Sequence, residues 1–247
     1  MVKDNRLTSF PKISIITVVW NAKQVLEQTI LSVINQSYKN IEYIVIDGGS
    51  NDGTLDILKE YNHAISYWKS EPDKGIYDAM NKGITAATGD WVVFVGAGDL
   101  LMNVIHKAVE SFSFPNYIYY GNVLRNDINK IYDGEFSGYK LAVSNICHQA
   151  IFYPTAALKK YKYELRYKAL ADHHLNMVLY GDNNFKFHHI PLVIAVYEGD
   201  GFSADNAVDV EFFNDKLAII KANFSSSVYY YALLRNRLAR LLAVKKN

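Results

Sequence analysis

The sequence predicts an α/β protein built on a mainly parallel central sheet, and two observations support this fold class. In the first hundred residues, short β-rich segments alternate with segments of helical periodicity. Strands that are joined through helices are typical of right-handed crossovers, which make the strands parallel and cover both faces of the sheet. Half of the 247 residues are hydrophobic, so the chain has enough apolar side chains to bury a large core.

The expected elements of the first half follow in order. Strands rich in β-branched and aromatic residues are expected at Ile13–Val19, Ile41–Asp47, 64–68 and 91–95. Helices are expected at 22–36, 54–61 and 74–87, because apolar residues recur there on one helical face. Ligands of such sheets bind at the carboxyl ends of the strands, so the residues just after each strand are the candidates for a site.

The second half is less regular. We expect an amphipathic stretch at 101–112, a tyrosine-rich strand at 117–120 and a helix at 170–180. No internal repeat or low-complexity linker divides the chain, so residues 1–215 are expected to form one body with halves 1–100 and 101–215.

The tail at 216–247 differs from the rest because no acidic residue follows Asp215. Basic residues accumulate there among leucines, a pattern that predicts a basic amphipathic helix. We interpret this helix as a contact with an anionic membrane surface. Packing against the body of the protein, or against the partner in a homodimer, is the alternative.

Composition limits the class of function. Lys and Arg total 26 against 25 for Asp and Glu, so the overall charge gives no reason to expect a nucleic-acid partner. Cys147 is the single cysteine, and the polar N-terminal residues 1–12 do not resemble a signal peptide. No apolar run approaches the ~18 residues of a membrane span. We expect a cytoplasmic protein that is soluble or peripherally attached to a membrane.

The ends of the first two strands carry the first candidate residues. The first strand leads through Val19 into Trp20 without the glycine fingerprint of dinucleotide-binding proteins, and no P-loop is present. The second ends in Asp47, and a glycine-rich acidic turn follows it. An acid at this position can accept a hydrogen bond from a nucleobase N–H. Ser50 or Asp52 in the same turn can instead cap the next helix, and we favour capping for Asp52 and ligand binding for Asp47.

Two further segments offer charged groups. Lys74 lies near an expected helix N-terminus, where a cation and free backbone N–H groups can together bind phosphate. Asp78 and Asn81 share one face of that helix, where a solvated, self-paired charged surface is the alternative. The fourth strand runs into Gly98 and Asp99, a lone acid among small residues that leaves room for a divalent cation and a diphosphate. Asp99 can also cap the following helix.

In combination, these motifs resemble the family 2 glycosyltransferases of the GT-A fold, especially the bacterial enzymes that build O-antigen, capsule and other surface polysaccharides. The resemblance covers residues 13–99 most strongly. It implies that Asp47 binds the base, which we expect to be uracil, with Val19 and Trp20 beside it. It also implies that Lys74 lies near the phosphates or ribose, and Asp78 belongs to the same candidate donor site.

The resemblance places Asp99 at the metal-binding end of an Asp-X-Asp-like motif, with Mn²⁺ or Mg²⁺ as the expected ion. The family commonly has two adjacent acids there, whereas this chain has Gly98 before Asp99. The departure removes one carboxylate that would touch the ribose or the metal. The metal role therefore rests almost entirely on Asp99.

In the second half, the resemblance implies that Asp172 is the catalytic base and that His148 and Gln149 line the acceptor site. Asp172 at a helix start can also be an ordinary N-cap. A zinc site from the histidines is a weaker alternative, because adjacent histidines on a helix diverge and no cysteine supports them; the residues are His173, His174, His188 and His189. Gly199 to Ser203 looks like a loop that closes over the donor, or a plain surface turn.

These expectations define an inverting hexosyltransferase that moves a sugar from a UDP-sugar to a saccharide acceptor, itself expected to be lipid-linked. We expect it to act in bacterial surface polysaccharide synthesis, including O-antigen, lipopolysaccharide or capsule, on the cytoplasmic face of the inner membrane. A sugar nucleotidyltransferase is one alternative, although the residues after the first strand lack its glycine-rich basic loop. A non-enzymatic nucleotide-sugar-binding or membrane-assembly subunit is the other.

Overall fold

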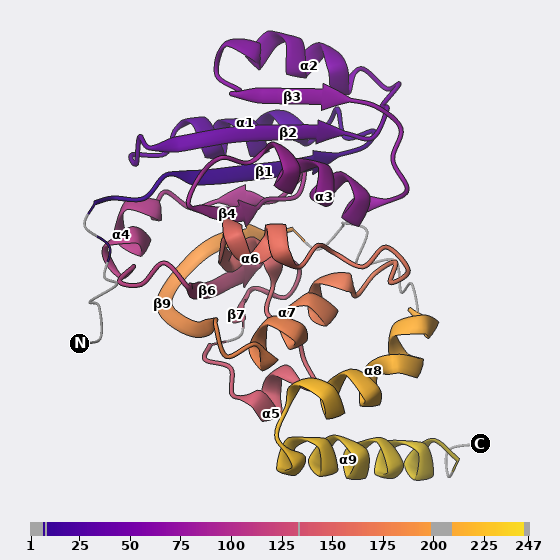
Figure 1. Cartoon of the computed structure of the whole chain (residues 1–247). Coiled ribbons are helices and arrows are strands. Elements are labelled where there is room, and N and C mark those ends of the chain that lie inside the picture. The colour runs from indigo at the N-terminus through magenta and orange to yellow at the C-terminus, as the bar shows by residue number, and fades with distance from the viewer. Residues whose placement is uncertain (1–6, 8, 133, 199–208, 245–247) are drawn as a thin grey trace.

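The structure is a computed structural model that describes residues 7, 9–132, 134–198 and 209–244. Its centre is one large sheet, in which the strands run in the order β3-β2-β1-β4-β8-β6-β9-β5, and β7 pairs with β6. In Figure 1 the sheet descends from β3 at the top to the curved strand β9, and the C-terminal helices lie below it.

The first half forms the parallel, helix-covered sheet that the sequence predicts. Its strands and helices are β1 Ile13–Val19, α1 Leu26–Ile34, β2 Ile41–Asp47, α2 Thr54–Glu60, the 3-10 turn Tyr61–His63, β3 Tyr67–Ser70, α3 Ile76–Ala86 and β4 Trp91–Phe94. β1 pairs in parallel with both β2 and β4, and β2 pairs in parallel with β3. β3 begins three residues later than expected, because its pairing with β2 starts only where Tyr67 meets Ile44.

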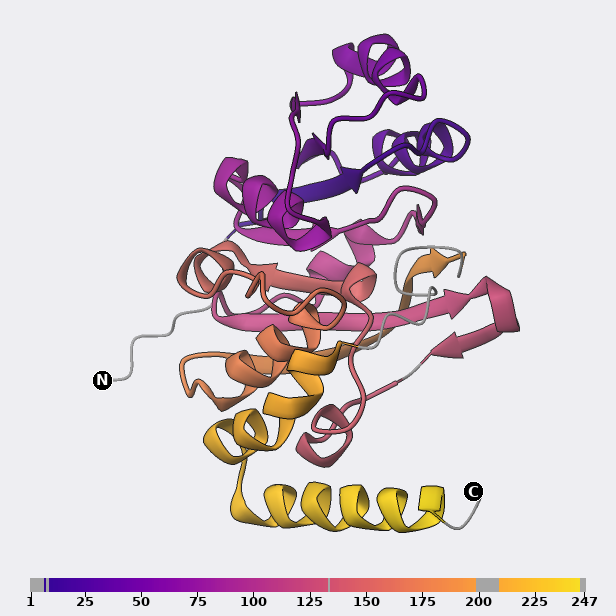
Figure 2. The same cartoon turned by 90° about the vertical axis from the view of Figure 1, so that its right-hand side faces the viewer.

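Alternate residues of the strands feed two separate apolar layers. Ile16 and Val18 of β1 belong to the layer that Met80 of α3 covers, whereas Ile13 and Ile15 belong to the layer that Leu26 of α1 covers. Figure 2 shows α3 on one side of this sheet and α1 and α2 on the other. A sheet that is buried on both faces explains why these strands read as continuous apolar runs.

The second half makes the sheet mixed. Its elements are β5 Leu100–Leu101, α4 Ile105–Glu110, β6 Tyr117–Arg125, the 3-10 turn Asn126–Ile128, β7 Lys130–Tyr132, α5 Gly138–Leu141, the 3-10 turn η3 His148–Ala150, β8 Ile151–Pro154, α6 Thr155–Lys160, α7 Ala171–Gly181 and β9 Lys186–Tyr197. β8 lies antiparallel to β4 and β6, while β6 and β9 run parallel. The amphipathic stretch at 101–112 forms a helix only at Ile105–Glu110.

The C-terminal segment forms two helices, α8 Val210–Asn223 and α9 Ser226–Val244, rather than one. The expected boundary between residues 215 and 216 falls inside α8. Val228 and Ala232 of α9 are buried, whereas Leu234 and Leu238 are exposed. Figures 1 and 2 both show α9 as a separate rod along the bottom of the molecule. Within the described ranges, no helix combines the length and apolar character that crossing a membrane requires.

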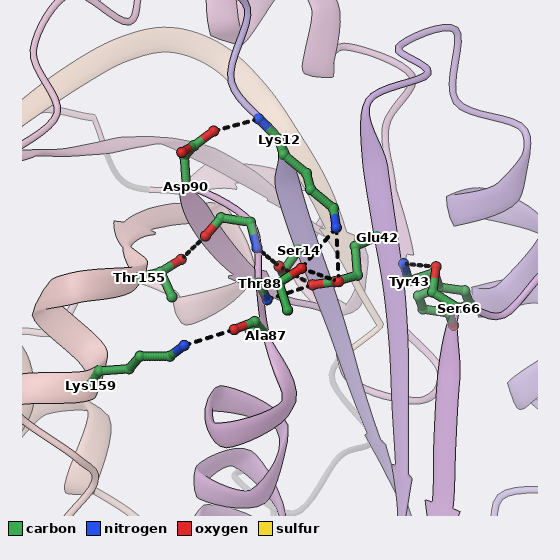
Figure 3. Close-up of polar contacts among 11 residues, drawn as sticks. Lys12, Ser14, Glu42, Tyr43, Ser66, Ala87, Thr88, Asp90, Thr155 and Lys159 are labelled. Carbon is green, nitrogen blue, oxygen red and sulfur yellow. Dashed lines mark hydrogen bonds and ion pairs between the residues drawn. The ribbon is translucent and has the colours of Figure 1, made fainter.

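A polar cluster at the amino end of the sheet joins the two halves (Figure 3). Glu42 of β2 accepts hydrogen bonds from Ser14 Oγ at 2.6 Å, Lys12 Nζ at 2.9 Å and Thr88 N at 2.8 Å. Thr155 Oγ1 of α6 donates to Gly89 O at 2.6 Å, so the loop before β4 contacts both halves. This end of the sheet lies opposite the carboxyl ends of the strands, so these hydrogen bonds stabilise the fold and are not part of the candidate site.

Candidate functional site

The turns after β1 and β2 are fastened to each other by side chains. Asn21 has the left-handed backbone (φ 47°), its N–H donates to Ser50 Oγ at 2.7 Å, and its Oδ1 accepts from Asn51 N at 2.9 Å. Asp52 accepts from Lys23 N at 3.0 Å and from Thr54 N at 2.9 Å. The second contact holds the turn that leads into α2, but the N-cap position of α2 is Gly53, so the prediction that Asp52 caps this helix is wrong.

Asp47 is the centre of the second turn. Its carboxylate is fully buried and accepts from Gly49 N at 3.0 Å, Ser50 N at 2.9 Å and Ser70 Oγ at 2.6 Å, and also from Ser50 Oγ. These bonds satisfy the carboxylate within the protein and fix the shape of the turn. A direct contact between Asp47 and a nucleobase stays a prediction. Trp20 is 68% exposed beside Gly48, on the open side of the turn.

The loop before α3 packs against the same turns. A Cβ atom on Gly48 would lie 2.5 Å from Asp73 Oδ2, so the two loops approach each other closely. Lys74 is exposed, and its backbone N–H donates to Asp78 Oδ2 at 3.1 Å. Asp78 also lies 3.6 Å from Lys82 Nζ, which is the self-pairing expected as the alternative for this face.

Asn81 has a structural task instead. Its side chain makes paired hydrogen bonds with the backbone of Tyr163, donating to the carbonyl oxygen and accepting from the N–H, both at 2.9 Å. It thereby fastens α3 to the segment before α7. Val19 and Asp47 end β1 and β2, Trp20 follows β1, and Lys74 and Asp78 lie just before and within the first turn of α3. All five lie at the carboxyl edge of the first half, where ligands of such sheets bind, and donor binding by them stays a prediction.

Asp99 lies in a tight turn after β4. Gly98 takes a positive φ of 104°, and its N–H donates to Thr29 Oγ1 at 2.9 Å. Thr29 Oγ1 in turn donates to Asp99 O at 2.9 Å, so α1 holds both sides of the turn. A Cβ on Gly96 would lie 2.9 Å from Asp99 Oδ2, and a larger residue there would displace the carboxylate. The small residues around Asp99 are therefore required by its position.

Asp99 is 8% exposed and, among the described residues, its carboxylate is incompletely paired. Oδ2 accepts from Gln149 Nε2 at 2.8 Å, and Oδ1 has a long contact of 3.4 Å with Glu198 N. Burial raises the pKa of Asp99, while the hydrogen bond from Gln149 and the proximity of His148 oppose that rise. The result is a desolvated carboxylate whose charge the protein compensates poorly, which is the state that a bound cation would relieve.

Asp172 is the second buried acid of the site, also 8% exposed. It is the second residue of α7, whose N-cap position is Leu170, so the interpretation of Asp172 as an N-cap is wrong. Oδ1 accepts from His173 N at 2.7 Å and from the Tyr77 hydroxyl at 3.1 Å. Oδ2 lies 3.5 Å from His148 Nδ1.

The 3-10 turn η3 brings the two acids together. His148 faces Asp172, and Gln149 donates to Asp99. Residues that are widely separated in sequence therefore meet where β4, η3 and α7 converge. The structure brings Asp99, His148, Gln149 and Asp172 together, and their roles in binding and catalysis stay predictions.

The other histidines do not assemble a metal site. His173 Nε2 lies 2.7 Å from Leu141 O, and burial lowers the pKa of His173 to about 4. His188 packs against Tyr119, and His189 Nε2 lies 3.1 Å from Asn122 Oδ1. In the part of the chain that the structure describes, no group of three His, Cys, Asp or Glu residues is placed to hold a metal. A cation at Asp99 would therefore need oxygens from the donor diphosphate.

Sequence reasoning missed two residues that shape the site. Tyr77 donates to Asp172, but in the sequence it is recognisable only as an aromatic residue on the core-facing side of α3. Asp209 caps α8 and also accepts from Ala169 N at 2.9 Å and Leu170 N at 3.1 Å, so it holds the start of α7. Pattern alone could not find this contact, because the two residues that donate to Asp209 lie about forty positions away. The expected loop at Gly199 to Ser203 lies outside the described residues.

Comparison with known proteins adds the family. Residues 14–171 match the domain described as Glycosyl transferase family 2. The chain belongs to this family. It is 34% identical over 211 residues to a PGL/p-HBAD biosynthesis glycosyltransferase of Mycobacterium bovis, and the match covers 82% of each chain.

Two solved structures share the fold of this family 2 protein. S. aureus TarS 1-349 in complex with UDP-GlcNAc has a TM-score of 0.73 at 16% identity, over 88% of this chain and 69% of that one. The mannosyltransferase PcManGT of Pyrobaculum calidifontis, in complex with GDP-Man and Mn²⁺, has a TM-score of 0.64 at 16% identity, over 95% and 81%. They confirm the GT-A-like fold, a curled mixed sheet flanked by helices.

Proposed function

We propose that this protein is an inverting glycosyltransferase that moves a sugar from a UDP-sugar to a hydroxyl of a saccharide acceptor. One observation carries the proposal: two consecutive residues of η3 contact the two buried acids, Gln149 at Asp99 and His148 at Asp172. Tyr77 joins Asp172 to α3, the helix that begins just after Lys74. One acid lies on the donor side and the other on the acceptor side. Two acids in separate environments are suited to separate roles.

The chemical step follows from this division. Asp172 accepts the proton of the acceptor hydroxyl as its oxygen attacks the anomeric carbon. The new C–O bond forms opposite the breaking bond to the diphosphate, which leaves with that electron pair, so the anomeric configuration inverts. His173 N and the Tyr77 hydroxyl hold Oδ1 of Asp172, and Oδ2 is turned toward His148. We assign the acceptor hydroxyl to the Oδ2 side.

Asp99 is the residue that would hold a divalent cation. Its poorly compensated, buried carboxylate fits Mn²⁺ or Mg²⁺, provided that the phosphate oxygens of the donor complete the coordination. When bound, such an ion supplies positive charge beside the leaving diphosphate. The Pyrobaculum mannosyltransferase, which shares this fold and was solved with GDP-Man and Mn²⁺, supports the assignment.

A thermal-shift panel of nucleotide sugars, with and without Mn²⁺, tests the donor class. Ligands that bind only the native state raise the melting temperature by mass action. We expect UDP-sugars to raise it more than GDP-sugars, and Mn²⁺ to increase the difference. A protein that responds to no UDP compound, with or without Mn²⁺, would contradict the proposal.

Asp172→Asn tests the catalytic base. General-base assistance is typically worth about a hundredfold to ten-thousandfold in rate, so we expect a loss of kcat in that range with nearly unchanged UDP affinity. Asp182→Asn is a suitable control, because Asp182 lies just after the opposite end of α7 and pairs with Lys160. Near wild-type turnover in Asp172→Asn would remove the assignment, and NMR of the product anomer tests inversion directly.

The acceptor and location are proposed from the C-terminal helices and the family. α9 exposes Tyr230, Leu234 and Leu238 at i, i+4 and i+8, with Arg235 and Arg237 also exposed. Such a surface suits binding to the cytoplasmic face of an anionic membrane. A lipid-linked saccharide acceptor in bacterial surface polysaccharide synthesis would be presented there.

A further inference from the structure

Tyr77 is a buried tyrosine that joins the donor half to the reacting acid. It is the second residue of α3 and is 7% exposed. Its ring packs against Tyr163 with centroids 5.2 Å apart. The hydroxyl lies 3.1 Å from Asp172 Oδ1 and 2.9 Å from Ala169 O. One O–H serves two acceptors, and an ionised carboxylate is the stronger of them.

The hydroxyl remains a donor throughout the working pH range. Burial raises the pKa of Tyr77 well above its usual value, and the nearby charge of Asp172 acts in the same direction. A donated hydrogen bond favours the ionised carboxylate over the protonated one. It also fixes Oδ1, so the other oxygen of Asp172 keeps one orientation toward His148.

We propose that Tyr77 is a positioning residue for glycosyl transfer, which orients Asp172 from the donor-side helix α3. The inference rests on the proposed role of Asp172 as base. Lys74 and Asp78 flank Tyr77 in sequence and are joined by the 3.1 Å bond from Lys74 N to Asp78. The loop before α3 and the orientation of Asp172 therefore both depend on residues 74–78.

A pH profile is the best measurement, so the surroundings of Asp172 matter. Among the described residues, the ionisable groups that act on Tyr77 or Asp172 are His148 on η3, Tyr153 on β8, Tyr163, His173 on α7 and Asp209 before α8. Burial raises the pKa of Tyr153 and Tyr163 well above the usual value and lowers that of His173 to about 4. These three stay uncharged near neutral pH. Profiles repeated in a His148→Gln background remove the remaining histidine.

The test compares two tyrosine-to-phenylalanine changes. Tyr77→Phe removes the hydroxyl that donates to Asp172, whereas Tyr163→Phe removes a buried hydroxyl that has no hydrogen-bond partner among the described residues. For Tyr77→Phe we expect a kcat roughly tenfold lower, a donor KM within about twofold, and an acid limb of the kcat profile at higher pH. Tyr163→Phe should retain the wild-type profile.

A fluorinated tyrosine at position 77 gives a second readout that keeps the hydroxyl and the packing. Its more acidic O–H is a stronger donor, so the acid limb should move to lower pH. Wild-type acid limbs in both position-77 variants, with Asp172→Asn inactive, would overturn the role of Tyr77 and leave the base assignment intact. Wild-type turnover in Asp172→Asn would instead remove the base and this inference together.

Discussion

At the scale of single residues, the two acids of the site differ in how the protein compensates them. Asp172 receives hydrogen bonds from Tyr77 and from His173 N, whereas Asp99 has one short hydrogen bond, from Gln149, within the part of the chain that the structure describes. Burial therefore raises the pKa of Asp99. Such an incompletely compensated charge lowers the folding stability of the ligand-free protein. It is expected in a binding site, where a bound ligand supplies the missing interactions.

Asp99→Asn should separate stability from ligand binding. Because the folded-state pKa of Asp99 is raised, its ionised form costs stability at every pH above that value. The neutral amide keeps an oxygen for Gln149, so we expect an unchanged or higher melting temperature at pH 7 and loss of Mn²⁺-dependent nucleotide binding by calorimetry. Asp56→Asn, on exposed α2, is the control and should alter neither. Retained Mn²⁺ dependence would place the metal elsewhere.

At the scale of elements, local sequence determines the donor side and tertiary pairing determines the rest. The turns around Asn21 and Asp52 are built from bonds between neighbouring loops whose glycines, serines and acids are typical of turns and caps. The elements β1, β2 and α3 were therefore predictable, and Asp47 and Lys74 with them. β8 could not be found in this way, because four residues between a 3-10 turn and a helix become a strand only by pairing with β4 and β6.

The tail shows the same limit. Its basic, leucine-rich character predicted helix, but not the break between α8 and α9. That break consists of Phe224 and Ser225, and the Phe224 ring stacks on Tyr180 of α7 with centroids 4.9 Å apart. The position of the break depends on a partner about forty residues away, which periodicity cannot show. His148, Gln149 and Asp172 were placed only by resemblance to the family.

Glu42 provides a test of how the elements are joined at the amino end of the sheet. Burial alone would raise its pKa, but hydrogen bonds from Ser14, Thr88 and Lys12 outweigh this and lower the pKa to about 2. The lowered pKa means that ionised Glu42 stabilises the fold above pH 4.5, the ordinary value, and that this contribution disappears as pH falls toward 2.

Glu42→Gln should therefore lower the melting temperature at pH 7 by about 2–4 °C, equivalent to about 1 kcal/mol, without affecting nucleotide binding. The loss should shrink steadily below pH 4.5. Glu110→Gln, on the exposed side of α4, is the matched control and should follow the wild-type curve. A deficit that is the same at pH 3 and pH 7 would show that the carboxylate charge is not what stabilises this junction.

At the scale of the whole molecule, the site and the proposed membrane surface are joined through α7 and α8. Asp209 is the N-cap of α8, and it also accepts hydrogen bonds from the backbone just before α7, the helix that carries Asp172. α8 then leads directly to α9, the rod at the bottom of Figures 1 and 2. Because Val228 and Ala232 of α9 are buried, deleting the helix would disturb the fold as well as the surface. Substitutions confined to exposed positions are the sharper test.

The double substitution Leu234→Gln and Leu238→Gln should weaken binding to vesicles that contain anionic lipid by about tenfold or more. The reason is that each apolar side chain that becomes buried in the membrane contributes roughly 1.5–3 kcal/mol to binding. Binding of the wild type should also weaken with added salt, since screening reduces the attraction of Arg235 and Arg237 to the surface.

The control is Ile128→Gln with Ile131→Gln, which removes two similarly exposed side chains on the β6–β7 hairpin. Activity on membrane-embedded acceptor should fall only in the α9 variant, while activity on a soluble acceptor analogue stays the same in both. Equal vesicle binding by the two double variants would show that α9 contacts protein, in this chain or a second copy, rather than lipid.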